Sequence, residues 1–403
     1  MRRWTFTPVA LALCTLGLAS GGAHAQFKEP DKVKIGFITD MSSLYADVEG
    51  KYGATAIQMA IDDFGGKVLG KPIELMSADH QNKADIAAGK AREWIDQQDI
   101  SLVFGGTNSA TALAMAKVAT EKKRVFVDNG AGTSVLTNEQ CSPYVVHYAF
   151  DTVALAKGTG KAVVDNGGKS WFFLTADYAF GHALEADTTK IVEANGGKVM
   201  GSVKTPLNAS DFSSFMLQAQ NSKAQILGLA NAGGDTVNSI KAAKEFGVTK
   251  DMKLAGLLIF FSDIHSLGVR NTEGLQFTTS WYWDLNAETR KFADKFMAKT
   301  KRRPSEIQAA DYSAAWNYLK AVEKAGTLEA DKVMAAWKGM EINDFFGKGR
   351  IRPDGRYAHD MYLMEVKSPA ESKGTWDYYK LIKTLPADQV WTTKEESKCQ
   401  YWK

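Results

Sequence analysis

Short apolar segments alternate with longer amphipathic segments through the first 150 residues of the chain. The predicted strands are 33–38, 72–77, 101–104 and 124–127, and the predicted helices are 53–64, 83–97 and 108–121. Short buried strands that alternate with helices are typical of a parallel sheet covered by helices on both faces. The alternation therefore predicts a doubly wound α/β unit.

The same alternation begins again in the following hundred residues. The predicted helices are 154–166, 178–194, 211–220 and 236–246, and the predicted strands are 170–174, 198–203 and 224–229. Glycines directly after the helices at 178–194 and 236–246 are good helix stops. Two successive units of one plan predict an α/β protein with two doubly wound parallel-sheet lobes.

The rest of the chain breaks the alternation. Two long amphipathic helices are predicted at 287–300 and 307–324, followed by strands between 344 and 366 around a turn at 353–355. We expect this part to return to both lobes, so that several segments cross between them as a hinge. The expected divisions are 1–25 (signal peptide), 26–150 (first lobe), 151–280 (second lobe), 281–345 (return to the first lobe) and 346–403 (return to the second lobe and C-terminal tail).

The first 25 residues have the pattern of a cleaved export signal. Arg2 and Arg3 precede an apolar stretch at 9–18, and Ala23-His24-Ala25 has the small-x-small pattern of a cleavage site. The apolar stretch is shorter than the about 20 residues that span a bilayer. The sequence thus predicts export to the periplasm and a mature chain that begins near residue 26.

Charge and cysteine content restrict the function further. The net charge is +3, and removal of the two arginines of the signal leaves the mature chain near +1. Such a balance has no concentrated basic patch for nucleic acid. Cys141 and Cys399 are the two cysteines after the signal, and an even pair in an oxidising compartment predicts one disulfide. The alternative is two buried free thiols.

Signatures of catalysis are absent from the sequence. There is no H-E-x-x-H zinc motif, no G-x-S-x-G nucleophile motif and no G-x-G-x-x-G after the first strand. Residues 158–161 (GTGK) resemble part of a phosphate loop, but Leu155 and Ala162 stand where glycine and a hydroxyl residue are required. We therefore expect helix there, and no enzyme, cofactor or metal site. An exported enzyme remains as an alternative.

Polar loops follow two neighbouring predicted strands of the first lobe. Thr107, Asn108 and Ser109 lie at the start of a helix, where hydroxyl and backbone N–H groups can bind an anion. The alternative is a plain helix cap. Ala131, Gly132 and Thr133 follow the next strand. Ligands of open α/β sheets bind beyond the carboxyl ends of strands, so both loops are expected to converge on one site.

Further candidate site residues come from other loops. Tyr45 follows the first strand, Tyr178 and Phe180 follow the strand at 170–174, Asn231 and Asp235 follow the strand at 224–229, and Phe260 lies farther along the second lobe. Aromatic side chains at such positions can stack on a ligand, and polar ones can orient it. Packing beneath the loops is an equally good interpretation of Tyr178 and Phe180.

Three segments together resemble the periplasmic solute-binding proteins of ABC transporters, above all the branched-chain amino acid binding type. They are VKIGFITDMSSLYADVEGKYGATAIQMAIDD, FGGTNSATALAMAKVATEKKRVFVDNGAGTSVLT and TADYAFGHALE. The resemblance covers essentially the whole mature chain. It implies two lobes joined by three crossovers, and a ligand carboxylate held at Thr107, Asn108, Ser109, Ala131 and Thr133. It also implies that Tyr178 or Phe180 closes over the ligand.

One departure from that family bears on the ligand. Amino acid binders of this type have an acidic residue after the strand near 254–258, whereas this chain is apolar there (LAGLLIFF) and Asp263 comes late. An unpaired buried ammonium group is costly, so the sequence favours a small organic acid. The segment TTSWYWDLN also resembles the subgroup associated with aromatic acid uptake.

The resulting hypothesis is a monomeric periplasmic component of an ABC importer that captures a small carboxylate by closure of two lobes. It would pass this ligand to an inner-membrane permease. A branched-chain amino acid, an amide or urea is the alternative ligand. A ligand-sensing subunit for a membrane receptor is the alternative role.

Overall fold

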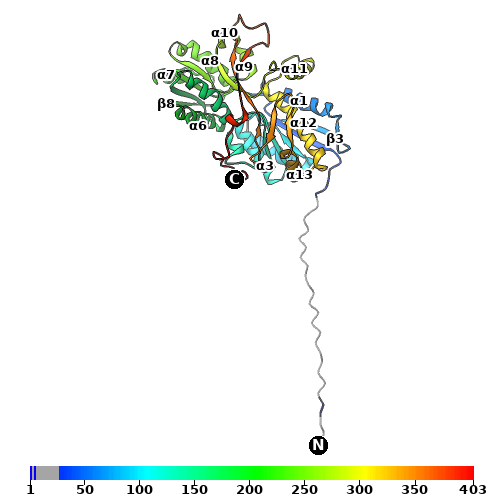
Figure 1. Cartoon of the computed structure of the whole chain (residues 1–403). Coiled ribbons are helices and arrows are strands. Elements are labelled where there is room, and N and C mark those ends of the chain that lie inside the picture. Colours follow the sequence, from blue (N-terminus) through cyan, green and yellow to red (C-terminus); the bar gives the residue numbers. More distant parts are fainter. Residues whose placement is uncertain (2–3, 6–26) are drawn as a thin grey trace.

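The computed structural model describes residue 1, residues 4–5 and residues 27–403. The predicted signal peptide therefore lies almost entirely outside the described residues. The described chain forms two α/β lobes that lie side by side (Figure 1), each built on its own parallel sheet. The predicted fold class is confirmed, and the first and second lobes are named below after the order of their sheets in the chain.

The first lobe is built on a six-stranded sheet in the order β2-β3-β1-β4-β5-β6. Its strands are β1 (Val33–Thr39), β2 (Lys67–Val68), β3 (Lys71–Asp79), β4 (Leu102–Phe104), β5 (Val125–Asp128) and β6 (Val145–His147). All neighbouring strands are parallel except β2, which pairs antiparallel with β3. β1, β4, β5 and β6 are buried almost throughout, as expected for strands covered on both faces.

Helices from two distant parts of the sequence cover this sheet. They are α1 (Gly50–Asp63), α2 (Ala84–Gln98) and α3 (Ser109–Glu121), and the returning α11 (Ala287–Thr300), α12 (Glu306–Ala325) and α13 (Ala330–Lys338). α12 packs along α1, and α13 packs on α12. In Figure 1 the yellow α12 accordingly lies among the blue elements of the first lobe.

The second lobe is built on a four-stranded parallel sheet in the order β10-β9-β7-β8. Its strands are β7 (Ser170–Ala176), β8 (Lys198–Thr205), β9 (Ile226–Ala230) and β10 (Lys253–Gly256). The helices of this part are α4 (Thr152–Leu155), α5 (Lys161–Asp165), α6 (Ala179–Ala194), α7 (Ser213–Asn221), α8 (Gly234–Glu245), α9 (Phe261–Leu267) and α10 (Val269–Thr272).

The helix predicted over 154–166 begins earlier and is not uniform. It runs from α4 through the π-helical turn η2 (Ala156–Gly160) into α5. The GTGK segment at 158–161 lies inside this helix, as predicted. Gly158 packs closely there, because an added Cβ would lie 2.2 Å from Thr278 Oγ1.

Two small antiparallel sheets were not predicted from the alternation. One contains β11 (Gln276–Thr279), β15 (Met361–Val366) and β16 (Tyr379–Leu385), and the other contains β12 (Glu341–Asn343), β13 (Lys348–Ile351) and β14 (Tyr357–Ala358). β13 and β14 flank the predicted turn at 353–355. The remaining short helices are η1 (Ser134–Thr137), η3 (Val248–Lys250) and α14 (Ala387–Val390).

Segments 148–151, 280–286 and 359–360 connect the two lobes, and the C-terminal tail runs from β16 back to the first lobe. Glu306 at the start of α12 accepts hydrogen bonds from the N–H (2.6 Å) and the hydroxyl (2.8 Å) of Ser280. His359 donates from Nε2 to the carbonyl of Ala149 at 3.0 Å, which joins the third crossing to the first. Buried polar contacts thus hold the crossings together as a hinge.

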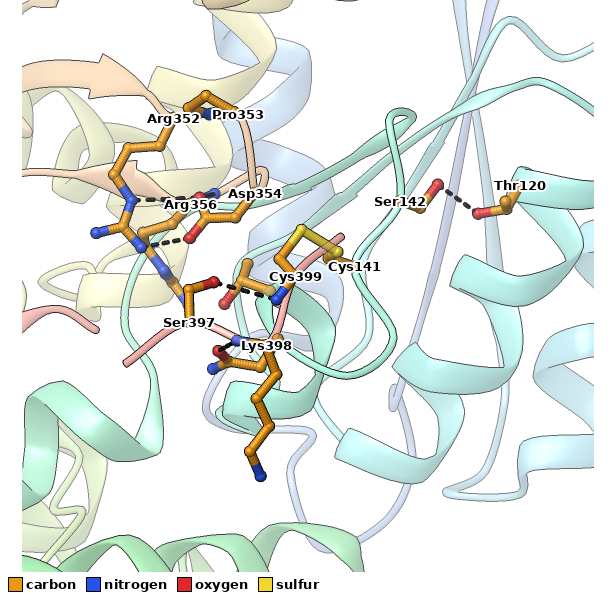
Figure 2. Close-up of a disulfide and its surroundings, with 12 residues drawn as sticks. Thr120, Cys141, Ser142, Arg352, Pro353, Asp354, Arg356, Ser397, Lys398 and Cys399 are labelled. Atoms are coloured by element: carbon orange, nitrogen blue, oxygen red, sulfur yellow. Dashed lines mark hydrogen bonds and ion pairs between the residues drawn. A yellow bond between two sulfur atoms is a disulfide. The ribbon is translucent and has the colours of Figure 1, made fainter. Parts of the chain in front are cut away.

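The predicted disulfide joins Cys141 to Cys399 and fastens the C-terminal tail to the first lobe (Figure 2). Close to it, Lys398 donates from its backbone N–H to Asn138 Oδ1 (3.3 Å) and from Nζ to Glu139 Oε1 (2.7 Å). The same tail reaches the second lobe, because Lys157 Nζ pairs with Glu396 at 2.9 Å. The tail therefore contacts both lobes.

Loss of the disulfide is expected to lower stability. Replacement of both Cys141 and Cys399 by serine should reduce the free energy of unfolding by roughly 2–5 kcal/mol, because the bridge restricts the unfolded chain across a long loop. The two cysteines are 258 residues apart. Equilibrium urea unfolding measures the change relative to the oxidised wild-type protein, and the reduced wild type should unfold like the double variant. An unchanged unfolding curve would contradict this expectation.

Candidate functional site

The two lobes meet around a small cavity of about 10 Å³ where the carboxyl ends of their strands face each other. The first lobe contributes Tyr45, Val48, Thr107, Gly130 and Gly132, and the second lobe contributes Tyr178, Phe180, Ala232, Leu258 and Phe260. The end of a parallel sheet at which its strands finish is where open α/β folds bind ligands. This cavity is therefore the candidate site.

A wider hollow of about 290 Å³ lies elsewhere, beside the C-terminal tail. It is lined by charged side chains that already pair with one another, among them Lys157 with Glu396 and Lys398 with Glu139. It does not lie at the strand ends. Its size therefore gives it no advantage over the smaller cavity between the lobes.

The loop between β4 and α3 approaches the cavity because two glycines permit its path. Gly105 has φ +124°, and an added Cβ would lie 2.4 Å from the carbonyl oxygen of Ile38. Only glycine adopts such a conformation readily. The close approach brings Thr107 next to β1, where its hydroxyl lies 3.1 Å from the hydroxyl of Thr39.

The start of α3 combines a helix cap with unused donors. Asn108 Oδ1 accepts hydrogen bonds from the N–H groups of Ala110 (2.8 Å) and Thr111 (3.2 Å). Within the described part of the chain, the N–H groups of Thr107, Asn108 and Ser109 have no hydrogen-bond acceptor. Unpaired N–H groups at the positive end of a helix are a ready site for an anion.

The loop after β5 meets this helix start, as predicted. The N–H of Thr133 donates to Ser109 Oγ at 3.2 Å, so the two polar loops converge. Ala131 is held from behind, because its carbonyl accepts a hydrogen bond from His147 Nε2 at 2.6 Å. Gly132 faces the second lobe, where an added Cβ would lie 2.7 Å from the ring of Phe180.

Two tyrosines from opposite lobes close one side of the cavity. The hydroxyls of Tyr45 and Tyr178 lie 2.7 Å apart. The carboxylate of Asp40 positions Tyr45 by accepting its backbone N–H at 2.8 Å. Burial, together with the adjacent Tyr178, raises the pKa of Tyr45 well above its usual range, so this hydroxyl stays protonated.

The opposite wall of the cavity is apolar. Phe180 is buried, and Phe260 packs against Phe150 of the first crossing with ring centroids 6.4 Å apart. Asp263 begins α9 and accepts the N–H of Phe260 at 2.9 Å. Burial raises the pKa of Asp263 to about 7. The late acidic residue of this segment thus holds the backbone of a wall residue.

Six of the twelve candidate ligand-binding residues line the cavity: Tyr45, Thr107, Gly132, Tyr178, Phe180 and Phe260. The other six surround it without lining it: Asn108, Ser109, Ala131, Thr133, Asn231 and Asp235. Asn231 hydrogen bonds to the following helix α8, to Ser239 and Thr236 at 2.8 Å each. Their roles in binding stay predictions.

Four lining residues were not among the candidates, namely Val48, Gly130, Ala232 and Leu258. Each lies close in sequence to a candidate, but an apolar side chain or a glycine has no chemical signature that marks a site. Leu258 comes two residues after β10, inside the apolar segment LAGLLIFF. The unusual apolar character of that segment is the signal that could have identified Leu258.

The family model for periplasmic binding proteins matches residues 32–375. The chain belongs to the periplasmic binding protein family. A crystal structure of a periplasmic binding protein from Burkholderia mallei is 65% identical, with a TM-score of 0.92, and covers 93% of this chain and 100% of that one.

Two further solved structures differ in their ligand class. A branched-chain amino acid ABC transporter periplasmic ligand-binding protein from Burkholderia xenovorans is 38% identical (TM-score 0.83, covering 92% of this chain and 100% of that one). A solute-binding protein of an ABC transporter from R. palustris, in complex with 4-hydroxybenzoate, is 26% identical (TM-score 0.80, covering 88% and 97%).

Membership of this family settles the general role. Periplasmic binding proteins of ABC transporters bind a small-molecule ligand in the periplasm, which implies a permease partner. The prediction that this protein is not an enzyme is confirmed by the family and by its structural neighbours. No helix among residues 27–403 is both long enough and apolar enough to cross a membrane.

Proposed function

We propose that this periplasmic binding protein captures a small aromatic carboxylate for an ABC importer, by closure of the second lobe over a ligand held on the first. The observation that carries the proposal is the set of unpaired N–H groups of Thr107, Asn108 and Ser109 beside the cavity. Together with the Thr107 hydroxyl, they offer donors to an anion at the start of α3.

The lining of the cavity supports an aromatic ligand. Phe180, Leu258 and Phe260 present an apolar wall opposite the donors. A flat ring with one carboxylate matches such a site, and the R. palustris neighbour is known with an acid of this class.

A branched-chain amino acid is the second candidate, favoured by the Burkholderia xenovorans neighbour. Its ammonium group would need an acceptor of opposite charge in the cavity. Among the described residues that line the cavity none is acidic, and Asp235 lies outside the lining and accepts the N–H of Asn208 at 3.1 Å. The lining therefore favours a ligand without an ammonium group.

A thermal-shift screen tests the ligand class. The panel contains benzoate, 4-hydroxybenzoate, short aliphatic acids, leucine, valine and an amide. A ligand present at 100 times its dissociation constant adds about 2.7 kcal/mol of stability, so the aromatic acids should raise Tm clearly. Stabilisation by leucine or valine, without an effect of the aromatic acids, would contradict the proposal.

Substitutions in the two polar loops test the carboxylate grip. Thr107→Ala and Thr133→Ala should each weaken benzoate binding about tenfold, because loss of one hydrogen bond to a charged group costs about 1.5–3 kcal/mol. Isothermal titration calorimetry measures the affinities. Thr55→Ala, on the outer side of α1, is the matched control and should leave the affinity unchanged. Wild-type affinity in both loop variants would refute the assignment.

A glycine substitution tests lobe closure. Gly132→Ala places a methyl group against Phe180 of the second lobe, and overpacking of this kind costs about 1–3 kcal/mol. The variant should therefore bind benzoate about tenfold more weakly, as measured by calorimetry. Gly89→Ala on α2 is the control, because its added Cβ meets nothing within 4 Å. Equal affinities of the two variants would show that closure does not bring these surfaces together.

A further inference from the structure

Two buried carboxyl groups from distant parts of the chain meet beneath the first-lobe side of the cavity. Glu49 precedes α1 and Asp311 lies on α12, and both side chains are fully buried. They share one glycine as neighbour, since a Cβ added to Gly53 would lie 2.6 Å from Asp311 Oδ2 and 2.9 Å from Glu49 Cγ. The two carboxyl groups therefore lie against each other in a space without water access.

Of the four carboxyl oxygens of Glu49 and Asp311, two accept a hydrogen bond from a protein donor and two do not. Asn129 Nδ2 donates to Asp311 Oδ1 at 2.7 Å, and Thr39 Oγ1 hydrogen bonds to Glu49 Oε2. Glu49 Oε1 and Asp311 Oδ2 have no protein donor within the described residues. A proton shared between these two oxygens satisfies both of them, as it does for carboxyl pairs in general.

The surroundings favour a second proton on the pair as well. Burial, and then the charge of Glu49, raise the pKa of Asp311 well above its usual range. Burial also raises the pKa of Glu49, to about 7. Hence the pair holds two protons in mildly acidic solution, and Glu49 loses its proton as the pH rises through neutrality.

The other charged groups near Glu49 act in the same direction. Asp40 faces it from the loop after β1 and raises its pKa, and Asp128 interacts with it from the end of β5. The cationic Arg356 and the ring of His147 lie on the far side of Asp128, where Arg356 pairs with Asp151 at 3.0 Å. The charges that face Glu49 from α12, β5 and the β1 loop are thus all carboxyl groups.

Two hydroxyls connect Glu49 to the cavity. Thr39 Oγ1 contacts Glu49 Oε2 and lies 3.1 Å from Thr107 Oγ1, and either threonine can be the donor. When Glu49 is ionised, Thr39 donates to it and Thr107 donates to Thr39, so the Thr107 proton points away from the ligand. When Glu49 is protonated, the direction of the hydrogen bonds can reverse: Glu49 donates to Thr39, and Thr39 donates to Thr107. The Thr107 hydroxyl is then free to donate into the cavity.

We propose that Glu49 is a positioning residue that orients the Thr107 hydroxyl through Thr39, so that a carboxylate ligand binds together with a proton on Glu49. The inference rests on the proposed function, since it requires an anion beside Thr107. It assigns a role to a buried chain of Asp311, Glu49, Thr39 and Thr107. A carboxylate near Thr107 in turn favours the protonated state of Glu49, because like charges repel.

Calorimetric titration of the mature protein with benzoate between pH 5.5 and 8.5 tests the proposal, because the only acidic group of benzoate is ionised throughout this range. The dissociation constant should be constant at the acidic end and rise above neutrality, toward about tenfold per pH unit. Titrations in buffers of different ionisation enthalpy should show uptake of up to about one proton per ligand at pH 8.

Glu49→Gln is the decisive variant. Its amide can accept the proton of Asp311 and donate permanently to Thr39, which mimics protonated glutamic acid. Between pH 5.5 and 8.5, the affinity of E49Q for benzoate should therefore stay at the value that the wild type has at the acidic end. Binding to E49Q should take up no proton. Thr39→Val provides a second test that leaves Glu49 in place, and it should flatten the pH dependence of binding.

Asp187→Asn is the matched control, because burial also raises the pKa of the Asp187 carboxyl, which lies in the hollow beside the C-terminal tail and not in the cavity. This variant should keep the pH dependence of the wild type. A pH-independent wild type, or an E49Q protein that keeps the full dependence, would overturn the inference alone. Absence of benzoate binding already at pH 6 would overturn the proposed function, and this inference with it.

Discussion

The site depends on one geometric constraint: the carboxyl ends of the strands in both parallel sheets face the same cavity between the lobes. Loops at the ends of such strands leave backbone N–H groups without partners. In this protein those loops come from two lobes, and the lobes meet around a small cavity of about 10 Å³. The unpaired donors beside α3 and the apolar wall of the second lobe are brought together in this way.

The contacts between the lobes are specific on both sides of the hinge. At the cavity, Tyr45 meets Tyr178 and Gly132 meets Phe180. Away from it, the C-terminal tail is fixed to the first lobe by the disulfide (Figure 2) and reaches Lys157 of the second. The hinge crossings carry buried hydrogen bonds of their own. These contacts fix the lobes in a defined arrangement, in which the space between them is small.

The sequence was most informative where periodicity is strong. Most strands and helices of both sheets, the disulfide and the family were predicted, because long amphipathic segments and paired cysteines leave clear patterns. The short strands β2 and β6 were not predicted. Strands around the turn at 353–355 were predicted, but β12 and the pairing of β12, β13 and β14 into a sheet were not, since strands of two to four residues show no period. The π-helical turn η2 was also missed, because it depends on tertiary packing around Gly158.

Prediction of the candidate site was limited in a similar way. Thr107, Tyr178 and Phe180 could be proposed because hydroxyl and aromatic residues in loops suggest a chemistry. Ala232 and Leu258 could not, because their contribution is shape alone. The contact of Glu49 with Asp311 had no sequence signal either, since the two residues are far apart in the chain and meet only when α12 packs on α1.

The most direct test of the central claim is a crystal structure of the mature protein grown with 4-hydroxybenzoate. The account predicts the ring against Phe180 and Phe260, with a carboxylate oxygen within hydrogen-bond distance of the N–H groups that begin α3. A ligand carboxylate bound on the second lobe, or a cavity left without the acid at saturating concentration, would contradict it.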